Sequence, residues 1–428
     1  MKRTFLVVSS LITVTSVASP TVTAVSFEQN RASKIVDIRY SLSDAAIVTV
    51  DILTNGVSVG GRNLRNLAGD VNTEVAAGVR RVTWRPWEGW SEGPAKTEIS
   101  AKVTAWPLWN PPDYLVVDLT EPYGHAYYPD EASLPGGIGS ADYRETKMVM
   151  RHIRAAGETF RMGLGANEYK GAWIQKNREY MTPHRVTLTN DFWLGVFEVT
   201  RAQFDLLKGS PQTYYGGTDN VKPGEKAGWL PADKEVIYNK LRGTTYHWPQ
   251  DGYQVASDSI FGALREKTGV TFDLPTQAEW EFSCRAGTTM QFFNGKDVGD
   301  VLYQSGSSWY MKGVDDILWR SSNNQPQCVG KLKPNAWGLY DMLGNEMEIV
   351  QDIWGSAKGV TADQIAPRGT TWNSSLLSRT RCGGCCNDNY SASKDTYCLA
   401  SGQNSITAGS GNNYTGARFA ALIPIVEK

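Results

Sequence analysis

Residues 273–288 read DLPTQAEWEFSCRAGT, and this stretch decides the fold. Thr276 is a good helix N-cap, because its hydroxyl oxygen can accept a hydrogen bond from a backbone N–H group of the first turn. The sequence therefore predicts a helix that begins after Thr276 and carries Glu279, Trp280 and Cys284.

A second informative block, PNAWGLYDMLGNEMEIVQD, occupies residues 334–352, and three shorter blocks accompany it. These are FRMG at 160–163, FEVTRAQF at 197–204 and GARFA at 416–420. Taken in their order along the chain, the blocks resemble the formylglycine-generating enzyme (sulfatase-modifying factor) family over residues 148–424. The resemblance implies an α+β fold with little regular structure, related to C-type lectins. One fold of this kind can host oxidases, accessory subunits and binding domains, so function has to be argued from the site.

The N-terminal residues 1–24 are typical of a secretory signal peptide. Lys2 and Arg3 precede a short apolar core, and small residues at 22–24 suit cleavage. The apolar core is too short to span a bilayer, and no later segment is apolar enough to do so. We therefore expect an exported protein, secreted, periplasmic or on the cell surface, in which disulfides can persist.

Residues 25–106 have the pattern of a small all-β domain. Residues 36–42 and 46–52 alternate between apolar and polar side chains, and Asn55-Gly56 is typical of a hairpin turn. Short strands with such turns predict a sandwich of immunoglobulin-like type. Residues 107–147 are rich in proline, glycine and tyrosine and are interpreted as a linker. The second domain is then expected to comprise residues 148–428.

The charge balance argues against one broad class of function. The chain holds 43 basic and 44 acidic residues, whereas a nucleic-acid-binding protein is usually strongly basic. We therefore expect no nucleic-acid partner. The four histidines are scattered and lack the spacing of metal ligands.

The loop from Leu343 to Glu348 combines a glycine turn with side-chain oxygen atoms. Gly344 permits a tight turn, and Asn and Glu side chains supply the hard oxygen ligands that Ca²⁺ prefers. The resemblance implies a structural calcium here, held by backbone carbonyl groups of Leu343, Gly344 and Glu346 and by the carboxylate of Glu348. The alternative is a turn in which Glu348 is ion-paired or solvated.

The resemblance also implies two catalytic thiols. The family oxidises a substrate cysteine with O₂ in what resembles copper–thiolate chemistry, and soft thiolates select Cu(I). Its first cysteine follows the aromatic residue of an Arg-Gly-Gly-Ser-aromatic motif by two positions, and the second lies five positions further on. The corresponding block is RGTTW at 368–372, which places Ser374 and Arg379 at the two positions. Neither side chain can be a copper thiolate.

A cluster of cysteines lies close to these positions: Cys382, Cys385 and Cys386, followed by Cys398. In an exported protein such cysteines can form structural disulfides. Alternatively, Cys382, Cys385 and Cys386 are the catalytic thiols of a displaced copper site or hold another metal. A third alternative is that they are incidental surface cysteines.

The composition of residues 373–393 suggests a further function. Lys, Glu, Gln, Met and Trp are absent, and the residues present are those that adenine mutation of Asn-type codons would produce. Some secreted proteins of this fold are similar in carrying a C-terminal patch diversified by retroelements. In that interpretation Trp372 belongs to a fixed framework. The alternative is an ordinary loop rich in serine and glycine.

Three functional hypotheses follow. The first is a non-catalytic or altered family member that binds a peptide, glycan or protein ligand through its C-terminal loops. The second is a copper-dependent oxidase that converts a substrate cysteine to formylglycine. The third is a diversified display protein. The candidate ligand-binding residues are Trp372, Asn373, Arg379, Arg381, Asn387 and Tyr390.

Overall fold

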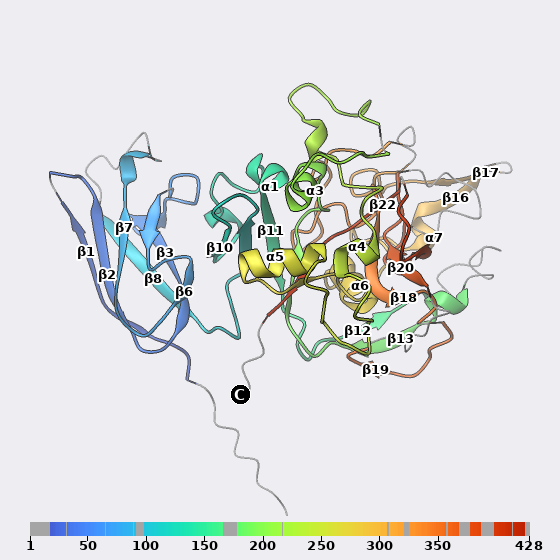
Figure 1. Ribbon diagram of the computed structural model, residues 1–428, viewed down its shortest axis with the longest axis horizontal. Helices are drawn as coiled ribbons and strands as arrows, with labels where there is room; N and C mark the ends of the chain where they lie inside the picture. The colour runs from blue at the N-terminus through green and yellow to red at the C-terminus, as the bar shows by residue number, and fades with distance from the viewer. Residues whose placement is uncertain are drawn as a thin grey trace, which may run out of the picture. The chain divides into compact units, whose positions relative to one another are not determined.

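The chain divides into two compact units (Figure 1), which a computed structural model describes. The first unit comprises residues 1–59, 65–111 and 424–428, and the second comprises 60–64 and 112–423. The described residues are 18–30, 32–64, 66–88, 90, 98–165, 178–215, 217–305, 308–320, 325–356, 358–367, 377–386, 398–412 and 414–423.

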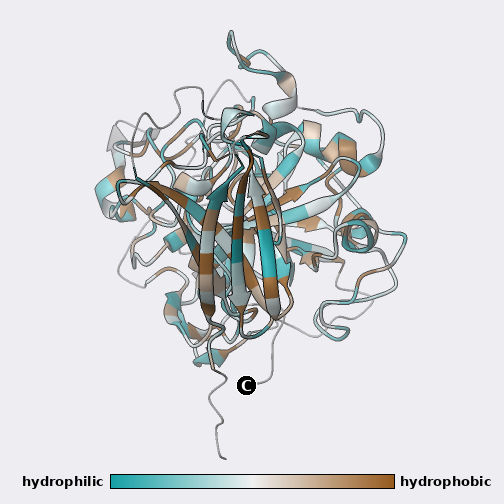
Figure 2. Cartoon of the chain, turned by 90° about the vertical axis from the view of Figure 1, so that its left-hand side faces the viewer, coloured by the Kyte–Doolittle hydropathy of each residue, from teal (hydrophilic) through white to brown (hydrophobic). Residues whose placement is uncertain are grey.

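Two β-sheets form the first unit. One has the strand order β1-β2-β7-β5, and the other has the order β4-β3-β6 with β8 also paired to β3. Along β2, Val36, Ile38, Tyr40 and Leu42 are buried at alternate positions, and Figure 2 shows hydrophobic and hydrophilic residues alternating along these strands. The immunoglobulin-like topology stays a prediction. The strands are β1 (Val22–Gln29), β2 (Val36–Leu42), β3 (Ala46–Thr54), β4 (Val57–Ser58), β5 (Leu67–Gly69), β6 (Thr73–Val75), β7 (Gly78–Trp84) and β8 (Ile99–Trp106).

Most of the predicted signal peptide lies outside the described residues. Its last part, residues 18–24, is described, and Val22, Thr23 and Ala24 are the first residues of β1. Among the helices that the structure describes, none is long and apolar enough to cross a membrane.

An antiparallel six-stranded sheet is the largest sheet of the second unit, with the order β10-β9-β11-β14-β23-β15. Its first two strands lie within the predicted linker at 107–147, for which extended pieces were expected: β9 and β10 pair with each other, and β9 also pairs with β11. The pairing was not predicted because both strands are short and lie between turns rich in proline and glycine. The strands are β9 (Tyr114–Asp118), β10 (Gly124–Tyr128), β11 (Lys147–Ile153), β14 (Phe192–Gly195), β15 (Phe272–Asp273) and β23 (Ala420–Leu422).

Smaller sheets complete this unit. A four-stranded sheet has the order β21-β20-β18-β22, a three-stranded sheet has the order β12-β13-β19, and β16 pairs with β17. The unit is thus α+β and rich in loops, as predicted. The strands are β12 (Thr159–Met162), β13 (His184–Thr187), β16 (Leu302–Ser305), β17 (Ser308–Met311), β18 (Met347–Ile353), β19 (Gln364–Ile365), β20 (Ser378–Cys382), β21 (Gln403–Thr407) and β22 (Thr415–Gly416).

Helices of the second unit are short. In α3, Thr200 and Gln203 form a capping box, and the helix ends at Gly209, which has a left-handed conformation (φ 68°) that glycine adopts without strain. The α-helices are α1 (Asp142–Glu145), α3 (Arg201–Lys208), α4 (Tyr238–Arg242), α5 (Ile260–Thr268), α6 (Gln277–Arg285) and α7 (Val298–Val301).

Candidate functional site

The stretch that decides the fold forms α6, as the sequence predicts. The Thr276 hydroxyl accepts a hydrogen bond from the Glu279 N–H group, and the Glu279 carboxylate accepts one from the Thr276 N–H group at 2.8 Å. Every residue of the helix is buried. Because this capping box satisfies two N–H groups at the helix start, α6 begins at a fixed point and presents its side chains from fixed positions.

Two hydrogen bonds join α6 to β18. The Gln277 N–H group donates to Asp352 Oδ2 at 2.6 Å, and Trp280 Nε1 donates to Glu348 Oε2 at 2.6 Å. β18 lies between β20 and β22 in its sheet. The two long sequence blocks therefore contact each other through α6 and β18, and we call this hydrogen-bonded unit the frame. Strand β20, which carries the second expected thiol position, pairs with β18.

A buried ion pair fixes the other side of Glu348. The Arg418 Nη2 atom lies 2.7 Å from Glu348 Oε1, and both side chains are almost completely buried. The remaining guanidinium donors bond to the carbonyl oxygens of Gly195, Val196 and Tyr340 at 2.7–2.9 Å. Burial opposes the charge of Arg418, but the Glu348 carboxylate outweighs it, and the pKa of Arg418 is raised.

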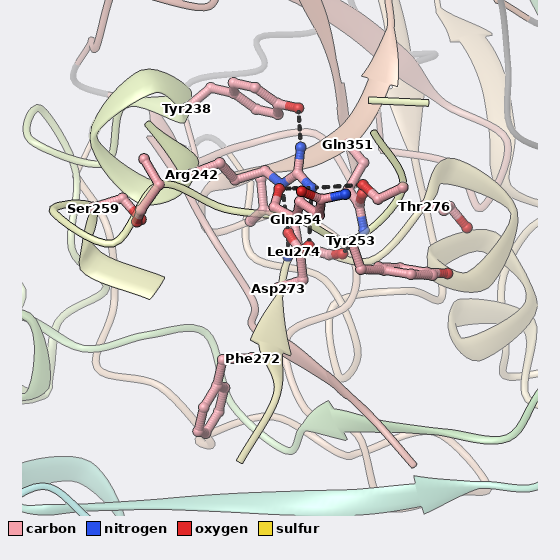
Figure 3. A network of polar contacts seen from close by, with 12 residues as sticks. Tyr238, Arg242, Tyr253, Gln254, Ser259, Phe272, Asp273, Leu274, Thr276 and Gln351 are labelled. Atoms are coloured by element: carbon pink, nitrogen blue, oxygen red, sulfur yellow. Dashed lines mark hydrogen bonds and ion pairs between the residues drawn. The ribbon is translucent and has the colours of Figure 1, made fainter. Parts of the chain in front are cut away.

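A second buried cation lies beside the start of α6, and Figure 3 shows its contacts. Arg242 Nε donates to Asp273 Oδ1 at 2.7 Å, and Arg242 Nη1 donates to the Tyr238 hydroxyl oxygen at 3.1 Å. Neither Arg242 nor Asp273 has more than 1 % of its side chain exposed. A buried ion pair costs desolvation energy that only dense hydrogen bonding offsets, and this pair has that bonding.

The predicted calcium loop is tightly folded. Gly344 has φ +80°, and a Cβ atom there would lie 2.0 Å from the Trp319 carbonyl oxygen, so only glycine fits. Asn345 Nδ2 donates to Glu198 Oε2 at 2.6 Å, and the Glu346 N–H group donates to Glu198 Oε1 at 3.0 Å. Glu198 thus holds the loop through two hydrogen bonds, although the sequence analysis did not single it out.

The two glutamates of this loop differ in how their carboxylate oxygens are bonded. Both oxygens of Glu348, the predicted calcium ligand, are bonded to Arg418 and Trp280. Glu346 has both carboxylate oxygens buried without a hydrogen-bond partner, and its pKa is raised well above the usual value by burial and by Asp233. Glu346 is thus the carboxylate of this loop whose oxygens have no partner among the described residues. Among the described residues, no three His, Cys, Asp or Glu side chains are arranged to hold a metal.

Arg379, at the second expected thiol position, is a core residue with 2 % of its surface exposed. Its guanidinium carbon lies 4.1 Å from the centre of the Tyr238 ring, and Nη1 donates to the Gln351 carbonyl oxygen at 3.0 Å. Its Nε atom is buried without a partner. Burial lowers the pKa of Arg379. Ser374, at the first thiol position, lies outside the described residues.

The candidate catalytic cysteines are buried. Cys382, Cys385 and Cys386 are at most 2 % exposed, so they are not incidental surface residues. Burial, followed by nearby carboxylates, raises the pKa of the Cys382 thiol well above its usual value, and Cys284 of α6 lies close enough to contribute. The structure holds all six cysteines as thiols, so the predicted disulfides are not shown.

The remaining candidate ligand contacts have different outcomes. Arg381 is 6 % exposed and its Nη2 atom donates to the Ser405 carbonyl oxygen at 2.9 Å. Like Arg379, it packs within the protein, which corrects the prediction that these two arginines contact a ligand. Long side chains next to a loop suggested exposure, but β20 is covered. Trp372, Asn373, Asn387 and Tyr390 lie outside the described residues.

Sequence reasoning missed the partners of the frame. Arg418 stands in the quoted GARFA block, and a lone arginine among apolar residues was the signal that could have suggested a buried ion pair. Glu198 stands in the FEVTRAQF block in the same way. Tyr238 gave no signal, because its role depends on Arg242 and Arg379, which are distant from each other in the chain.

The chain belongs to the sulfatase-modifying factor enzyme 1-like domain family, because the model of that family matches residues 139–421. This match includes both sequence blocks that form the frame. It is 25 % identical over 276 residues to the formylglycine-generating enzyme of Bos taurus, covering 56 % of this chain and 67 % of that protein. It is also 25 % identical over 199 residues to chaperone protein LppX of Paenibacillus barcinonensis, covering 42 % and 68 %.

A solved structure, Treponema denticola variable protein 1, is similar with a TM-score of 0.45 and 20 % identity. The match covers 65 % of this chain and 96 % of that one.

Proposed function

We propose that this protein is a non-catalytic or altered family member that binds a peptide, protein or glycan ligand through its C-terminal loops. The observation that carries the proposal is the packing of Arg379. A guanidinium group cannot ligate Cu(I), which prefers soft thiolate ligands. Because Arg379 lies over Tyr238 and bonds to the Gln351 carbonyl group, it belongs to the core of the sheet.

The burial of the nearby thiols supports the same conclusion. A thiolate is the form that binds copper or attacks a sulfur atom, and burial in apolar surroundings disfavours it. Cys382 is 2 % exposed with a strongly raised pKa, so it holds its proton at neutral pH. A substrate cysteine would also have to reach this buried position. The described residues thus favour binding over oxidation.

The surroundings of β20 are suited to a binding surface. The strand lies between segments 368–376 and 387–397, which carry the candidate contacts Trp372, Asn373, Asn387 and Tyr390. At the described edge of the first segment, Leu377 is 55 % exposed. Nearby, Tyr180 stacks on Trp354 with 4.8 Å between ring centres, and the Trp354 N–H group bonds to the Ser378 carbonyl oxygen. Half-buried aromatic residues of this kind are enriched in binding sites.

An aldehyde assay tests the absence of oxidase activity. The full chain is incubated with Cu(I), O₂ and a cysteine peptide carrying a sulfatase motif, and the peptide is analysed by mass spectrometry. We expect no aldehyde above the protein-free control. Aldehyde formation that is lost in Cys382→Ser or Cys385→Ser would establish the copper-dependent oxidase instead.

A binding assay tests the loops. The full chain is applied to peptide and glycan arrays beside the double variant Trp372→Ala/Asn373→Ala, with Val79→Ser, at an exposed position of the first unit, as the matched control. We expect ligands whose signal disappears in the loop variant and persists in the control. Binding that survives the loop substitutions would contradict the proposal.

The display hypothesis concerns the same loops and is tested at the gene. It predicts a reverse transcriptase gene beside a near-copy of the 3′ end, and a locus without them would remove it. Export is likewise a proposal, supported by the pattern of residues 1–24. N-terminal sequencing of protein recovered outside the cytoplasm tests it, and an intact Met1 there would contradict cleavage.

A further inference from the structure

A cavity of about 480 Å³ opens in the second unit, on a different set of elements from the C-terminal loops. Its walls come from the turn before β12, from β12, from the end of α6 and from Trp337. Pockets that bind small molecules usually measure about 300–1,000 Å³. The cavity therefore has the size of a ligand site. Phe282 and Arg285 of α6 line it, but none of the candidate thiol or ligand-binding residues does.

Three aromatic rings form the apolar wall of this cavity. Phe160 and Phe282 have ring centres 5.2 Å apart, and Phe282 and Trp337 have ring centres 5.0 Å apart. Both pairs are tilted by 58°. Phe160 and Trp337 are partly exposed, whereas Phe282 is buried behind them. The rings thus present faces and edges to a ligand without being fully covered by protein.

The backbone around the cavity is already satisfied. Asn335 Nδ2 donates to the carbonyl oxygens of Ser283 and Cys284 at the end of α6, and Asn335 Oδ1 accepts from the Trp337 N–H group at 3.0 Å. Arg285 is paired with Glu281 at 2.7 Å. The cavity is therefore held open by contacts of its own and needs no ligand to form, which lowers the entropic cost of binding.

The side chains at the mouth are polar and nearly balanced in charge. Arg154 is ion-paired with Asp113 at 2.6 Å. Arg161 and the exposed Glu158 also line the cavity and carry opposite charges. Arg154 and Arg285 have carboxylate partners of their own, and Glu158 offsets the charge of Arg161, so the mouth offers little net attraction to either an anion or a cation. A neutral polar ligand therefore fits this mouth better.

Hydrogen-bonding groups without a protein partner are available to such a ligand. Trp337 Nε1, the Thr289 hydroxyl group and the Glu158 carboxylate form no hydrogen bond with any residue that the structure describes. The Thr288 hydroxyl oxygen accepts from the Met290 N–H group at 3.1 Å, which leaves its proton to be donated. These groups offer both donors and acceptors.

We propose that this cavity binds a neutral saccharide. The C–H groups of a sugar ring are apolar and can pack on Phe160 and Trp337, while its hydroxyl groups can both donate to Glu158 and accept from Trp337 Nε1. A polyhydroxy ring is a neutral ligand class that can use an aromatic wall and several hydrogen-bonding groups together. The inference does not depend on the C-terminal loops, because it uses other residues.

Saturation-transfer difference NMR on the full chain tests this inference. The probes are glucose, galactose, mannose, N-acetylglucosamine and their β-1,4-linked disaccharides, with glucuronic acid and the peptide Gly-Phe-Gly as comparisons. We expect transfer to at least one neutral saccharide at millimolar concentration. We expect Trp337→Ala to weaken it about tenfold or more, which corresponds to about 1.4 kcal/mol.

Glu158→Gln keeps the shape of an exposed side chain and should weaken saccharide binding several-fold without unfolding the protein. It therefore decides the question even if Trp337→Ala fails to fold. Trp87→Ala, at a 47 % exposed position of the first unit, should leave saccharide transfer unchanged. The absence of transfer to any neutral saccharide, transfer insensitive to Glu158→Gln, or transfer only to the peptide or to glucuronic acid would each overturn the inference.

Discussion

The two strand neighbours β18 and β20 differ in how their buried polar groups are satisfied. On β18, Glu348 has both oxygens bonded, and its partner Arg418 uses all three guanidinium nitrogens. On β20, Arg379 Nε and Thr380 Oγ1 are buried without a partner among the described residues, and Gln351 Oε1, on the part of β18 that faces Arg379, also lacks one. Buried polar groups are destabilising unless they are hydrogen-bonded.

This contrast separates a preserved frame from an altered site. The Glu348–Arg418 pair within the family blocks is fully bonded, whereas Arg379, at the second expected thiol position, has a buried nitrogen without a partner. We infer that the frame determines the stability of the second unit and that β20 contributes less. The predictions below test this difference.

The largest effect is expected from Glu348→Gln, which leaves the charge of Arg418 buried without its carboxylate. Breaking a buried ion pair in this way usually costs about 3–5 kcal/mol. Urea unfolding of the second unit measures the loss. Asp316→Asn is the matched control in the same unit, because the Lys333 side chain that it pairs with is 74 % exposed, and such pairs contribute about 1 kcal/mol or less. Equal losses in both variants would contradict the role of the frame.

A pH dependence of similar size is expected from Glu279. Burial raises the pKa of its carboxyl group from 4.5 to about 7. Because the folded pKa is the higher one, this group stabilises the fold below pH 4.5, and the contribution is lost as the pH rises to about 7, by about 3 kcal/mol at most. Glu279→Gln keeps a hydrogen-bond acceptor for Thr276 and should flatten the profile of unfolding free energy against pH. An unchanged slope between pH 4.5 and 7 would refute the assignment.

Calcium is expected to act through Glu346. If the loop binds Ca²⁺, saturation at 100 times Kd adds about 2.7 kcal/mol of stability. Thermal unfolding with calcium and with EDTA measures this increment, and Glu346→Gln should abolish it. Glu235→Gln, on an exposed pair with Lys240, should keep it. A calcium increment that survives Glu346→Gln would show that another carboxylate is the ligand.

The smallest effect is expected from Arg379→Met. The substitution removes a buried charge with one unpartnered nitrogen and loses a single hydrogen bond, to the Gln351 carbonyl oxygen. We expect a change within about 1 kcal/mol, because replacing such a charge by an apolar side chain is often neutral. Arg242→Met is the matched control, since it leaves the buried Asp273 carboxylate with only the longer, 3.4 Å contact to Arg265 as an ion pair. The comparison fails if both variants lose the same stability in urea unfolding.

The parts of this molecule that were predictable from sequence are those with local signals. Thr276 and α6 depend on a capping pattern within a few residues, and the distance from Trp372 to Arg379 is a count along the chain. The α+β character followed from the family blocks. These features need no knowledge of which distant segments pair.

The parts that could not be predicted depend on contacts between distant residues. Residues of β9 and β10 were interpreted as part of a linker, because only their pairing with each other and with β11 shows that they belong to a sheet. The ion pair of Glu348 with Arg418, 70 residues away, could not be read from the sequence, and the expected calcium ligation by Glu348 stays a prediction. Arg379 and Arg381 were expected at a surface, and only the packing of the sheet around β20 shows that they are buried.

A Cu(I) competition titration tests the central claim most directly. The reduced full chain is titrated against bathocuproine disulfonate, in parallel with Cys382→Ser. The account predicts that wild-type protein and variant leave the copper with the chelator equally, because Arg379 stands where a thiolate would be needed. One equivalent of Cu(I) held by the wild type and released by Cys382→Ser would contradict it.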